Sequence, residues 1–343
     1  MDPFEQAWDE AVALHTAAAD TLDRGETALA AQRAADALAA LSGLLGADHP
    51  DAANAAVTLG EALLRGGDLA GAAVHLEGAV AALGRHRRHP DVRPLWWNAR
   101  KIRADLWRQE GRYGDAVAEL GRVLRGPAQE LATTNLLGIA RRFAGDYAGA
   151  KRAYLRALAW LNAHTPDDAA TRAVLHHNLS GLAHARGDYS ISEYHIRTAL
   201  ALRGDARDAA YGGDLGGLAL ALVELGRAEE ALAAFDEARA IYAQTLPPDH
   251  PEVAYLLHNL GDAWMAVARP QEALDAYDQS LALKRARLGA DHPEVAVSLA
   301  NSRLPLLALG RAEEAASRLI EARRIVQGLP EGHPFREGVL SVT

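Results

Sequence analysis

Residues 250–293 read HPEVAYLLHNLGDAWMAVARPQEALDAYDQSLALKRARLGADHP and contain the pattern that organises the whole chain. Two runs with apolar residues at helical spacing are separated by a short turn at Ala268. The small residue Ala273 follows that turn by five positions, and a His-Pro pair marks each place where a first helix begins. The stretch therefore predicts an antiparallel helix pair followed by the beginning of the next pair.

Turns of this kind recur eight times in the 343 residues, at Gly25, Gly67, Gly111, Gly145, Gly187, Gly226, Ala268 and Gly310. Successive turns are 42, 44, 34, 42, 39, 42 and 42 residues apart, and a small residue follows each by five: Ala30, Ala72, Ala116, Ala150, Ser192, Ala231, Ala273 and Ala315. Such a period is typical of a solenoid, in which each unit buries its apolar face against its neighbours. We expect an all-α array of about eight antiparallel helix pairs. Residues 1–48 are expected to form an N-terminal capping pair, residues 49–328 the array, and residues 329–343 a C-terminal tail.

The composition narrows the classes of protein to which the chain can belong. It has no cysteine, which excludes disulfides, cysteine-bound zinc and thiol nucleophiles. The acidic N-terminus lacks the apolar segment of a secretory signal, and no apolar run of about 18 residues predicts a membrane span. We therefore expect a cytoplasmic protein. The abundance of alanine and the scarcity of lysine indicate a GC-rich bacterial genome.

Charge is distributed unevenly along the chain. The net charge is −9, yet residues 85–156 carry 16 Arg and Lys against 7 Asp and Glu, which gives this basic belt a charge of +9. The remainder of the chain then carries −18. An uneven charge distribution of this kind affects which charged partners are attracted to the protein and says little about the fold.

The sequence resembles the tetratricopeptide repeat family. The residues that carry the resemblance are a Leu-Gly pair, an aromatic residue, an alanine and a further aromatic residue, as in Leu260, Gly261, Trp264, Ala273 and Tyr277. Leu137-Gly138 and Leu59-Gly60 begin similar series, and the long period with Leu-Gly-x-Asp-His-Pro at 288–293 resembles the kinesin light chain type of repeat. The resemblance implies a right-handed superhelical solenoid that binds other proteins.

The resemblance also implies where a partner would bind. In that family the first helix of each pair lines the concave groove, and the residue before Leu-Gly points into it. With neighbours at helical spacing, the expected partner-binding residues are Lys101, Asp105, Arg108, Asn135, Arg142, His177, Asn178, His184, Gly213, Gly216, Gly217, Tyr255, His258, Asn259, Asp262 and Asn301. Asparagine amides can bond a peptide backbone, and arginine and lysine favour a ligand that carries carboxylates. The recurrent asparagines have a second interpretation, as consensus residues inherited with the repeat.

Four glycines, Gly212, Gly213, Gly216 and Gly217, lie in the expected first helix of the sixth unit and are predicted to face the groove. Each costs about 1 kcal/mol relative to alanine in a helix interior, so a reason is needed. One reason is the close approach of a ligand backbone. The other is a helix that starts late, with Gly212 and Gly213 in its cap.

Histidines are frequent in the fifth unit, which contains His176, His177, His184 and His195. His177 and His184 with His258 and Asp262 would form a mixed metal site if they met, but about 20 Å of stacked helices separates their units. We therefore expect neither a metal site nor a cofactor. No nucleophile elbow, zinc-protease motif or dinucleotide-binding motif is present, so a catalytic role is not expected.

The most favoured function is that of a scaffold which binds a peptide or helix of a partner, with an acidic segment preferred. A first alternative is a sensor or enzyme that uses small molecules or metal in the histidine-rich groove. A second alternative is binding of single-stranded nucleic acid by the basic belt, where Trp96, Trp97, Trp107 and Trp160 accompany the cations. Self-association through the C-terminal end is a further expectation if the tail leaves the last apolar face exposed.

Overall fold

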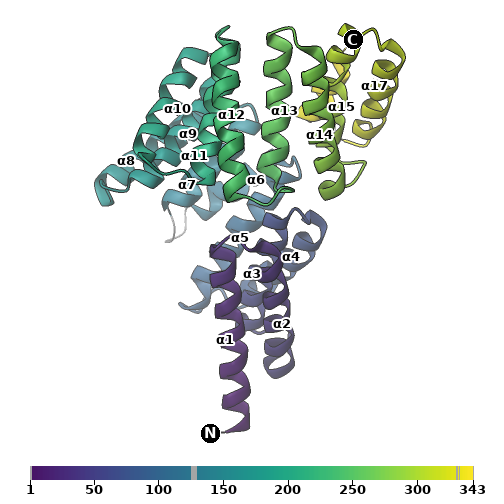
Figure 1. The fold of residues 1–343 in the computed structure, drawn as a ribbon. Coiled ribbons are helices and arrows are strands. Elements are labelled where there is room, and N and C mark those ends of the chain that lie inside the picture. The colour runs from purple at the N-terminus through teal and green to yellow at the C-terminus, as the bar shows by residue number, and fades with distance from the viewer. Residues whose placement is uncertain (1, 125–129, 330, 332, 343) are drawn as a thin grey trace. The chain divides into compact units, whose positions relative to one another are not determined.

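The chain is all-α in the computed structural model, which describes residues 2–124, 130–329, 331 and 333–342 (Figure 1). The helices of the first half are α1 (Pro3–Asp23), α2 (Thr27–Leu45), α3 (Pro50–Gly66), α4 (Leu69–Arg85), α5 (Val92–Gln109), α6 (Tyr113–Val123), α7 (Glu130–Phe143) and α8 (Tyr147–His164). Those of the second half are α9 (Ala169–Ala185), α10 (Tyr189–Arg203), α11 (Ala209–Glu224), α12 (Ala228–Thr245), α13 (Pro251–Ala266), α14 (Pro270–Leu288), α15 (Pro293–Asn301), α16 (Arg303–Ala308), α17 (Ala312–Val326) and α18 (Pro334–Leu340).

The eight predicted turns are confirmed. Each turn residue has a positive φ, a conformation that glycine adopts without steric cost. Ala268, with φ of 57°, takes the same left-handed conformation despite its side chain. Because every turn joins two helices over a few residues, the described chain forms the eight expected helix pairs.

The small residues that follow the turns are buried. All eight are at most 1% exposed, from Ala30 to Ala315. The glycines of the Leu-Gly pairs have a related role. A Cβ on Gly261 would lie 2.8 Å from the ring of Tyr277, and one on Gly60 would lie 2.7 Å from Leu76. In these repeats glycine therefore allows the second helix to place a large side chain directly against the first.

Histidine side chains cap several first helices. Nδ1 of His49, His250, His292 and His333 accepts a hydrogen bond from the backbone N–H two residues later, and the proline between them is the first helical residue. The same His-Pro pattern as in residues 250–293 predicts a helix start at His49-Pro50, His89-Pro90 and His333-Pro334. This is correct at the four histidines above and wrong at His89-Pro90, because α5 begins later, at Val92, with Asp91 as its N-cap.

The last repeat departs from a plain helix pair. Its first helix breaks at Ser302, since Pro305 has no N–H to donate to the carbonyl of Asn301 and its ring crowds that carbonyl. Beyond α17, helix α18 packs on α15 and α17 and buries Val339. The tail therefore covers part of the last apolar face, while Leu304 and Leu307 of α16 stay exposed.

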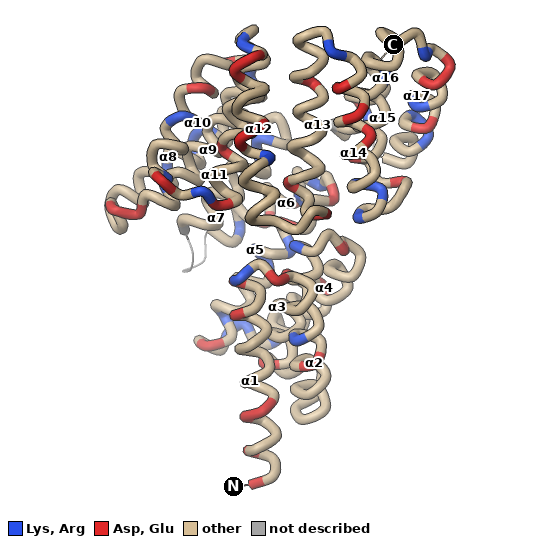
Figure 2. Tube along the Cα trace, viewed as in Figure 1, with Lys and Arg blue, Asp and Glu red and all other residues tan. Residues whose placement is uncertain are grey.

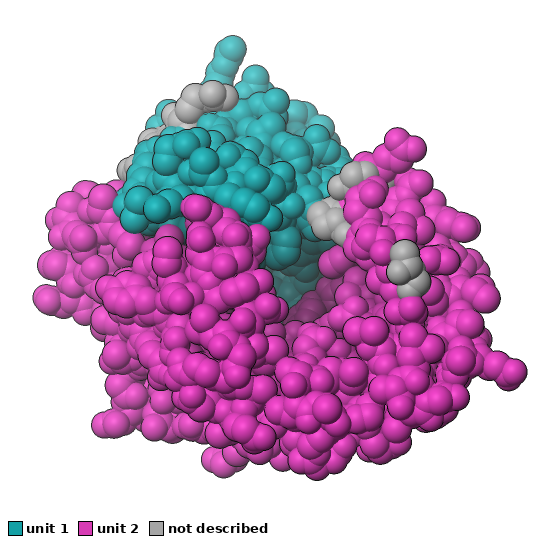
Figure 3. All heavy atoms as spheres, turned by 90° about the horizontal axis from the view of Figure 1, so that it is seen from above, with its two compact units in different colours: residues 1–157 teal, residues 158–343 magenta. Residues whose placement is uncertain are grey.

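The helices fall into two compact units, residues 1–157 and 158–343 (Figure 3). Within each unit, successive first helices contact one another directly: α1–α3, α3–α5 and α5–α7 in the first, α9–α11 and α11–α13 in the second. The side formed by the first helices is therefore the more closely packed side of each unit, and we call it the inner side. Among the described residues, no helix combines the length and apolar character needed to cross a bilayer. The predicted division at residues 48 and 328 stays a prediction.

Candidate functional site

A histidine anchored by a buried carboxylate lies on the inner side of the second unit. Nδ1 of His177 in α9 lies 2.7 Å from Oδ1 of Asp214 in α11, whose other oxygen accepts from Nε of Arg203 at 2.5 Å. Asp214 has no solvent exposure, whereas the His177 side chain is 45% exposed. A neutral imidazole that donates Nδ1–H to Asp214 presents Nε2 as an acceptor. The arrangement fixes one ring edge and leaves the other available to a ligand.

The four glycines of α11 lie beside this pair. The interpretation as a late-starting helix is wrong, because α11 begins at Ala209 with Asp208 as its N-cap. A Cβ on Gly212 would lie 2.6 Å from the ring of Tyr242, and one on Gly217 would lie 3.1 Å from Ile196. The chain's own side chains thus fill the space next to these two glycines. Added Cβ atoms on Gly213 and Gly216 would make only ordinary contacts, at 3.4 and 3.5 Å.

A second polar cluster joins α13, α14 and α15. Ser298 Oγ lies 3.3 Å from Nδ1 of His258 and accepts from Nζ of Lys284 at 3.0 Å, and Asn301 Nδ2 lies 3.1 Å from Nε2 of His258. Burial, with Lys284 nearby, lowers the pKa of His258 to about 3. Burial likewise lowers the pKa of Lys284. His258 is thus held neutral, and both of its ring nitrogens have partners inside the protein.

The predicted site residues around this cluster are also engaged. The Tyr277 hydroxyl donates to Asp262 Oδ1, and the Tyr255 hydroxyl donates to Glu294 Oε1 at 2.7 Å. Burial raises the pKa of Asp262. Asn259 is partly buried on α13 beside His258. The structure therefore brings Tyr255, His258, Asp262 and Asn301 together. Hydrogen bonds within the protein already occupy many of their polar atoms.

The two histidine pairs occupy the same place in the repeat. His177 and His258 each lie ten residues before a turn residue, and their partners Asp214 and Ser298 each lie twelve before the next one. Sequence reasoning missed Asp214, Ser298 and Lys284. Asp214 and Ser298 could have been noticed in the sequence, because the equivalent residue of the seventh repeat is the apolar Leu256.

Three arginines of the basic belt share one buried carboxylate of the first unit. Glu119 in α6 is 1% exposed and accepts from Arg100 at 2.6 and 2.7 Å, from Arg103 at 2.6 Å and from Arg122 at 3.1 Å. Burial raises the pKa of Glu119, but these bonds lower it to about 2. Figure 2 shows basic and acidic positions interspersed along the chain. Not every cation of the belt is therefore available to an external ligand.

The tryptophans of the belt also have internal partners. The Arg100 guanidinium lies 4.6 Å from the Trp96 ring centre and 4.8 Å from that of Trp97. Arg103 and Arg112 lie 4.5 and 4.7 Å from the ring of Trp107. Trp96 also packs on the preceding repeat, where a Cβ on Gly84 would lie 3.3 Å from its Nε1. These contacts disfavour the stacking of nucleic-acid bases on Trp96, Trp97 and Trp107.

The remaining predicted residues of the first unit lie on α5 and α7. Arg108 Nε donates to Asp105 at 2.6 Å, and burial lowers the pKa of Lys101. Asn135 is partly buried. Arg142 differs from these, because it has no ion pair within the described chain and its guanidinium lies 4.7 Å from the Phe143 ring centre. Burial lowers the pKa of Arg142.

The histidine-rich fifth unit does not gather into the metal site considered from the sequence. His176 and His195 meet each other, with their Nδ1 atoms 3.1 Å apart, while His184 lies edge-on to the ring of Tyr189. His177 turns to Asp214. Across residues 2–124, 130–329, 331 and 333–342, no three metal-ligating side chains come together.

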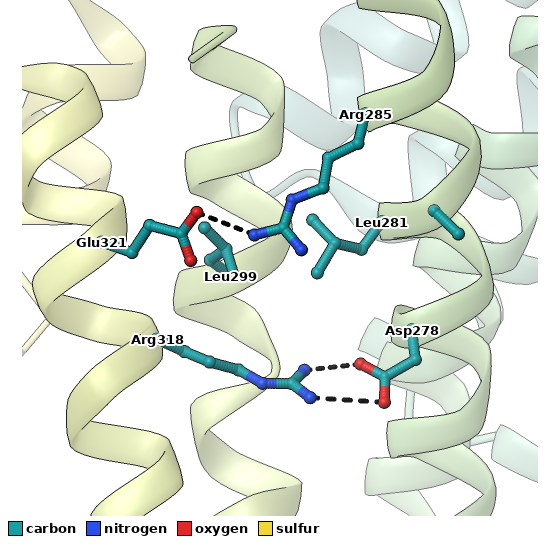
Figure 4. A pocket seen from close by; sticks show the side chains of 7 residues that line it. Asp278, Leu281, Arg285, Leu299, Arg318 and Glu321 are labelled. Carbon is teal, nitrogen blue, oxygen red and sulfur yellow. Dashed lines mark hydrogen bonds and ion pairs between the residues drawn. The ribbon is translucent and has the colours of Figure 1, made fainter. Parts of the chain in front are cut away.

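A cleft of about 300 Å³ lies between the second helices of the last repeats (Figure 4). Arg318 of α17 bonds Asp278 of α14 at 2.5 Å, and Arg285 of α14 bonds Glu321 of α17 at 2.8 Å. Leu281 and Leu299 contribute apolar surface between the two ion pairs. None of the predicted partner-binding residues lines this cleft.

Comparisons with known proteins identify the fold. Residues 213–286 match the tetratricopeptide repeat family. The chain is similar to a Rap protein complexed with Competence and Sporulation Factor, at 12% identity and a TM-score of 0.60, over 81% of this chain and 77% of that one. It is also similar to a tetratricopeptide repeat protein from Parabacteroides merdae, at 15% identity and a TM-score of 0.56, over 91% and 99%.

A third similar structure is that of putative kinesin light chain repeats from Podosopora anserina, at 23% identity and a TM-score of 0.47, over 57% of this chain and 94% of that one. No curated protein matches the sequence. The chain therefore has the fold of tetratricopeptide repeat arrays. Arrays of this kind are scaffolds that present long surfaces to other proteins.

Proposed function

We propose that the chain is a non-catalytic cytoplasmic scaffold whose inner surfaces bind an extended segment of a partner protein. The His177–Asp214 pair is the observation that carries the proposal. A fully buried carboxylate fixes a half-exposed imidazole on the inner side, so Nε2 can accept a backbone N–H without first being ordered. A solved array of the same fold holds a bound factor, which fits this use of the inner side.

The alternatives have weaker support. A metal-dependent or small-molecule function would use His177 and His184 of α9 with His258 of α13, but each of these histidines contacts a different partner within the protein. Nucleic-acid binding would use Trp96, Trp97 and Trp107, whose faces carry guanidinium groups of the same chain. We therefore favour the polar groups of the inner side as the surface that recognises a partner protein.

A photo-crosslinking experiment tests the proposal with a matched pair of tyrosines. Tyr255 lies on a first helix and is 40% exposed, and Tyr194 lies on a second helix and is 64% exposed. Each would be replaced in turn by p-benzoylphenylalanine, and the purified chain would be irradiated in lysate of its source cells. We expect a discrete protein adduct from position 255 that position 194 does not give. The same adduct from both positions, or none from position 255, would contradict inner-side binding.

A further inference from the structure

Arg142 on α7 is a partly buried arginine that makes no ion pair within the described chain. The other well-buried arginines of the first unit, such as Arg100 and Arg103, share the carboxylate of Glu119. Nε of Arg142 is buried and makes no hydrogen bond. A buried cation without a counter-charge is costly, so such a group is retained in a fold for a reason.

A second arginine and an exposed aromatic ring accompany it. Arg108 and Arg142 each lie three residues before a turn, so they hold the same register in adjacent repeats. The ring of Phe143 lies 4.7 Å from the Arg142 guanidinium and 6.0 Å from that of Arg108, and Tyr113 stacks on it at 5.6 Å. Phe143 is 39% exposed. The two cations and the ring therefore form one patch that reaches solvent.

The seventh repeat shows what the fourth repeat lacks. Tyr154 and Tyr277 hold the same register, nine residues after their turns, and both are buried. The Tyr277 hydroxyl donates to Asp262, but the residue at the place of Asp262 in the fourth repeat is Ile139, and the Tyr154 hydroxyl makes no hydrogen bond. The fourth repeat thus has no carboxylate at the place of Asp262, and the carboxylate of Asp105 in the preceding repeat is already bonded by Arg108.

We propose that the Arg108–Arg142 patch binds the carboxylate of an acidic side chain from the partner, with Arg142 as its main contact. The inference rests on the proposed scaffold function and adds the chemistry of one ligand residue. A carboxylate would pair the unpartnered guanidinium in a geometry that arginine favours, and Phe143 and Tyr113 would pack beside it. A phosphate of nucleic acid fits less well, because the nearby tryptophan faces are covered by arginines.

The test uses a fluorescein-labelled peptide of eight glutamates, with the matching glutamine peptide as its neutral counterpart, at low salt. Arg142→Gln is compared with Arg152→Gln, which removes the same charge from an exposed position on α8. We expect the glutamate peptide to bind about tenfold more weakly to Arg142→Gln and within about twofold of wild type to Arg152→Gln. Equal weakening by both substitutions, or no preference for glutamate, would overturn the proposal.

Ile139→Asp is the second variant, and it keeps the test valid if Arg142→Gln unfolds. It supplies the carboxylate that Asp262 supplies to Tyr277, so the chain should keep its melting temperature and lose the glutamate peptide. Undiminished binding by this variant would overturn the proposal, as would tighter binding of an eight-residue oligothymidylate than of the peptide. If the Arg108–Arg142 patch does not bind the glutamate peptide but the Tyr255 crosslink still forms, the scaffold function stands and only the acidic contact is wrong.

Discussion

Nδ1 of His177 lies 2.7 Å from Oδ1 of Asp214, which ties the first helix of one repeat to the first helix of the next. Arg203 completes the arrangement from α10, so one carboxylate joins three helices. Because Asp214 has no exposure, water cannot replace either partner. The contact therefore stabilises the second unit and orients the imidazole at once.

Asp214→Asn should strongly destabilise the second unit. Removing one partner of a buried ion pair leaves Arg203 without compensation and costs about 3 kcal/mol. Urea unfolding followed by circular dichroism would measure the loss. Asp236→Asn is the control, because its side chain is 60% exposed against Arg239 and its loss should cost within about 0.5 kcal/mol. Similar effects from the two substitutions would contradict the assigned role of Asp214.

Glu119→Gln should destabilise the first unit, since it leaves three arginines around a neutral group, at a cost of about 3 kcal/mol or more. The wild-type contribution also depends on pH. The folded pKa of Glu119, about 2, lies below its ordinary value of 4.5, so its stabilisation is present above pH 4.5 and is lost as pH falls toward 2. Acid unfolding of wild type and variant would be compared. A variant whose acid transition coincides with that of wild type would count against this account.

Much of the repeat could be predicted from sequence because its determinants are local. A turn that needs positive φ selects glycine, and a helix crossing selects a small residue five positions later, as at Gly226 and Ala231. The break at Ser302 was equally local, since Pro305 marks it, but the pattern of complete helices obscured it.

The bonding of the site could not be predicted in the same way. Whether His258 faces a ligand or Ser298 depends on how adjacent repeats rotate against each other, which no single repeat encodes. The same holds for Gly212 and Gly217, whose space is taken by side chains from neighbouring helices. Long-range polar pairs therefore appear only once the stacking of repeats is known.

Ala268→Gly should raise stability by about 1 kcal/mol, because the left-handed conformation costs an alanine roughly that amount. The residue is exposed, so the methyl group that is lost makes little contact. The converse substitution, Gly226→Ala at the equivalent turn, should lower stability by a similar amount. Thermal unfolding of both variants would decide the matter, and a destabilised Ala268→Gly chain would refute the strain argument.

Gly212→Ala and Gly216→Ala should have opposite effects although both lie in α11. A Cβ at 212 would lie 2.6 Å from the ring of Tyr242, which is 3% exposed and cannot move aside, so we expect a loss of about 1–3 kcal/mol. A Cβ at 216 would lie 3.5 Å from Leu256, an ordinary contact, and helix propensity should then stabilise by about 0.5–1 kcal/mol. Urea titrations would show the difference. Two stabilised variants would mean that the space beside Tyr242 is larger than the structure indicates.

The unfolding free energy should fall between about pH 7 and pH 5, in part because of His258. Burial and Lys284 lower the folded pKa of His258 to about 3, while the unfolded value is near 6.5. Below pH 6.5 the unfolded chain therefore binds a proton that the folded chain excludes, and stability falls by about 1.4 kcal/mol per pH unit until pH 3. Other histidines titrate as well, so wild type is compared with His258→Asn by urea unfolding at both pH values. Wild type should lose about 2 kcal/mol more than the variant over this interval, and an equal loss in both would show that His258 takes up its proton without unfolding the repeat.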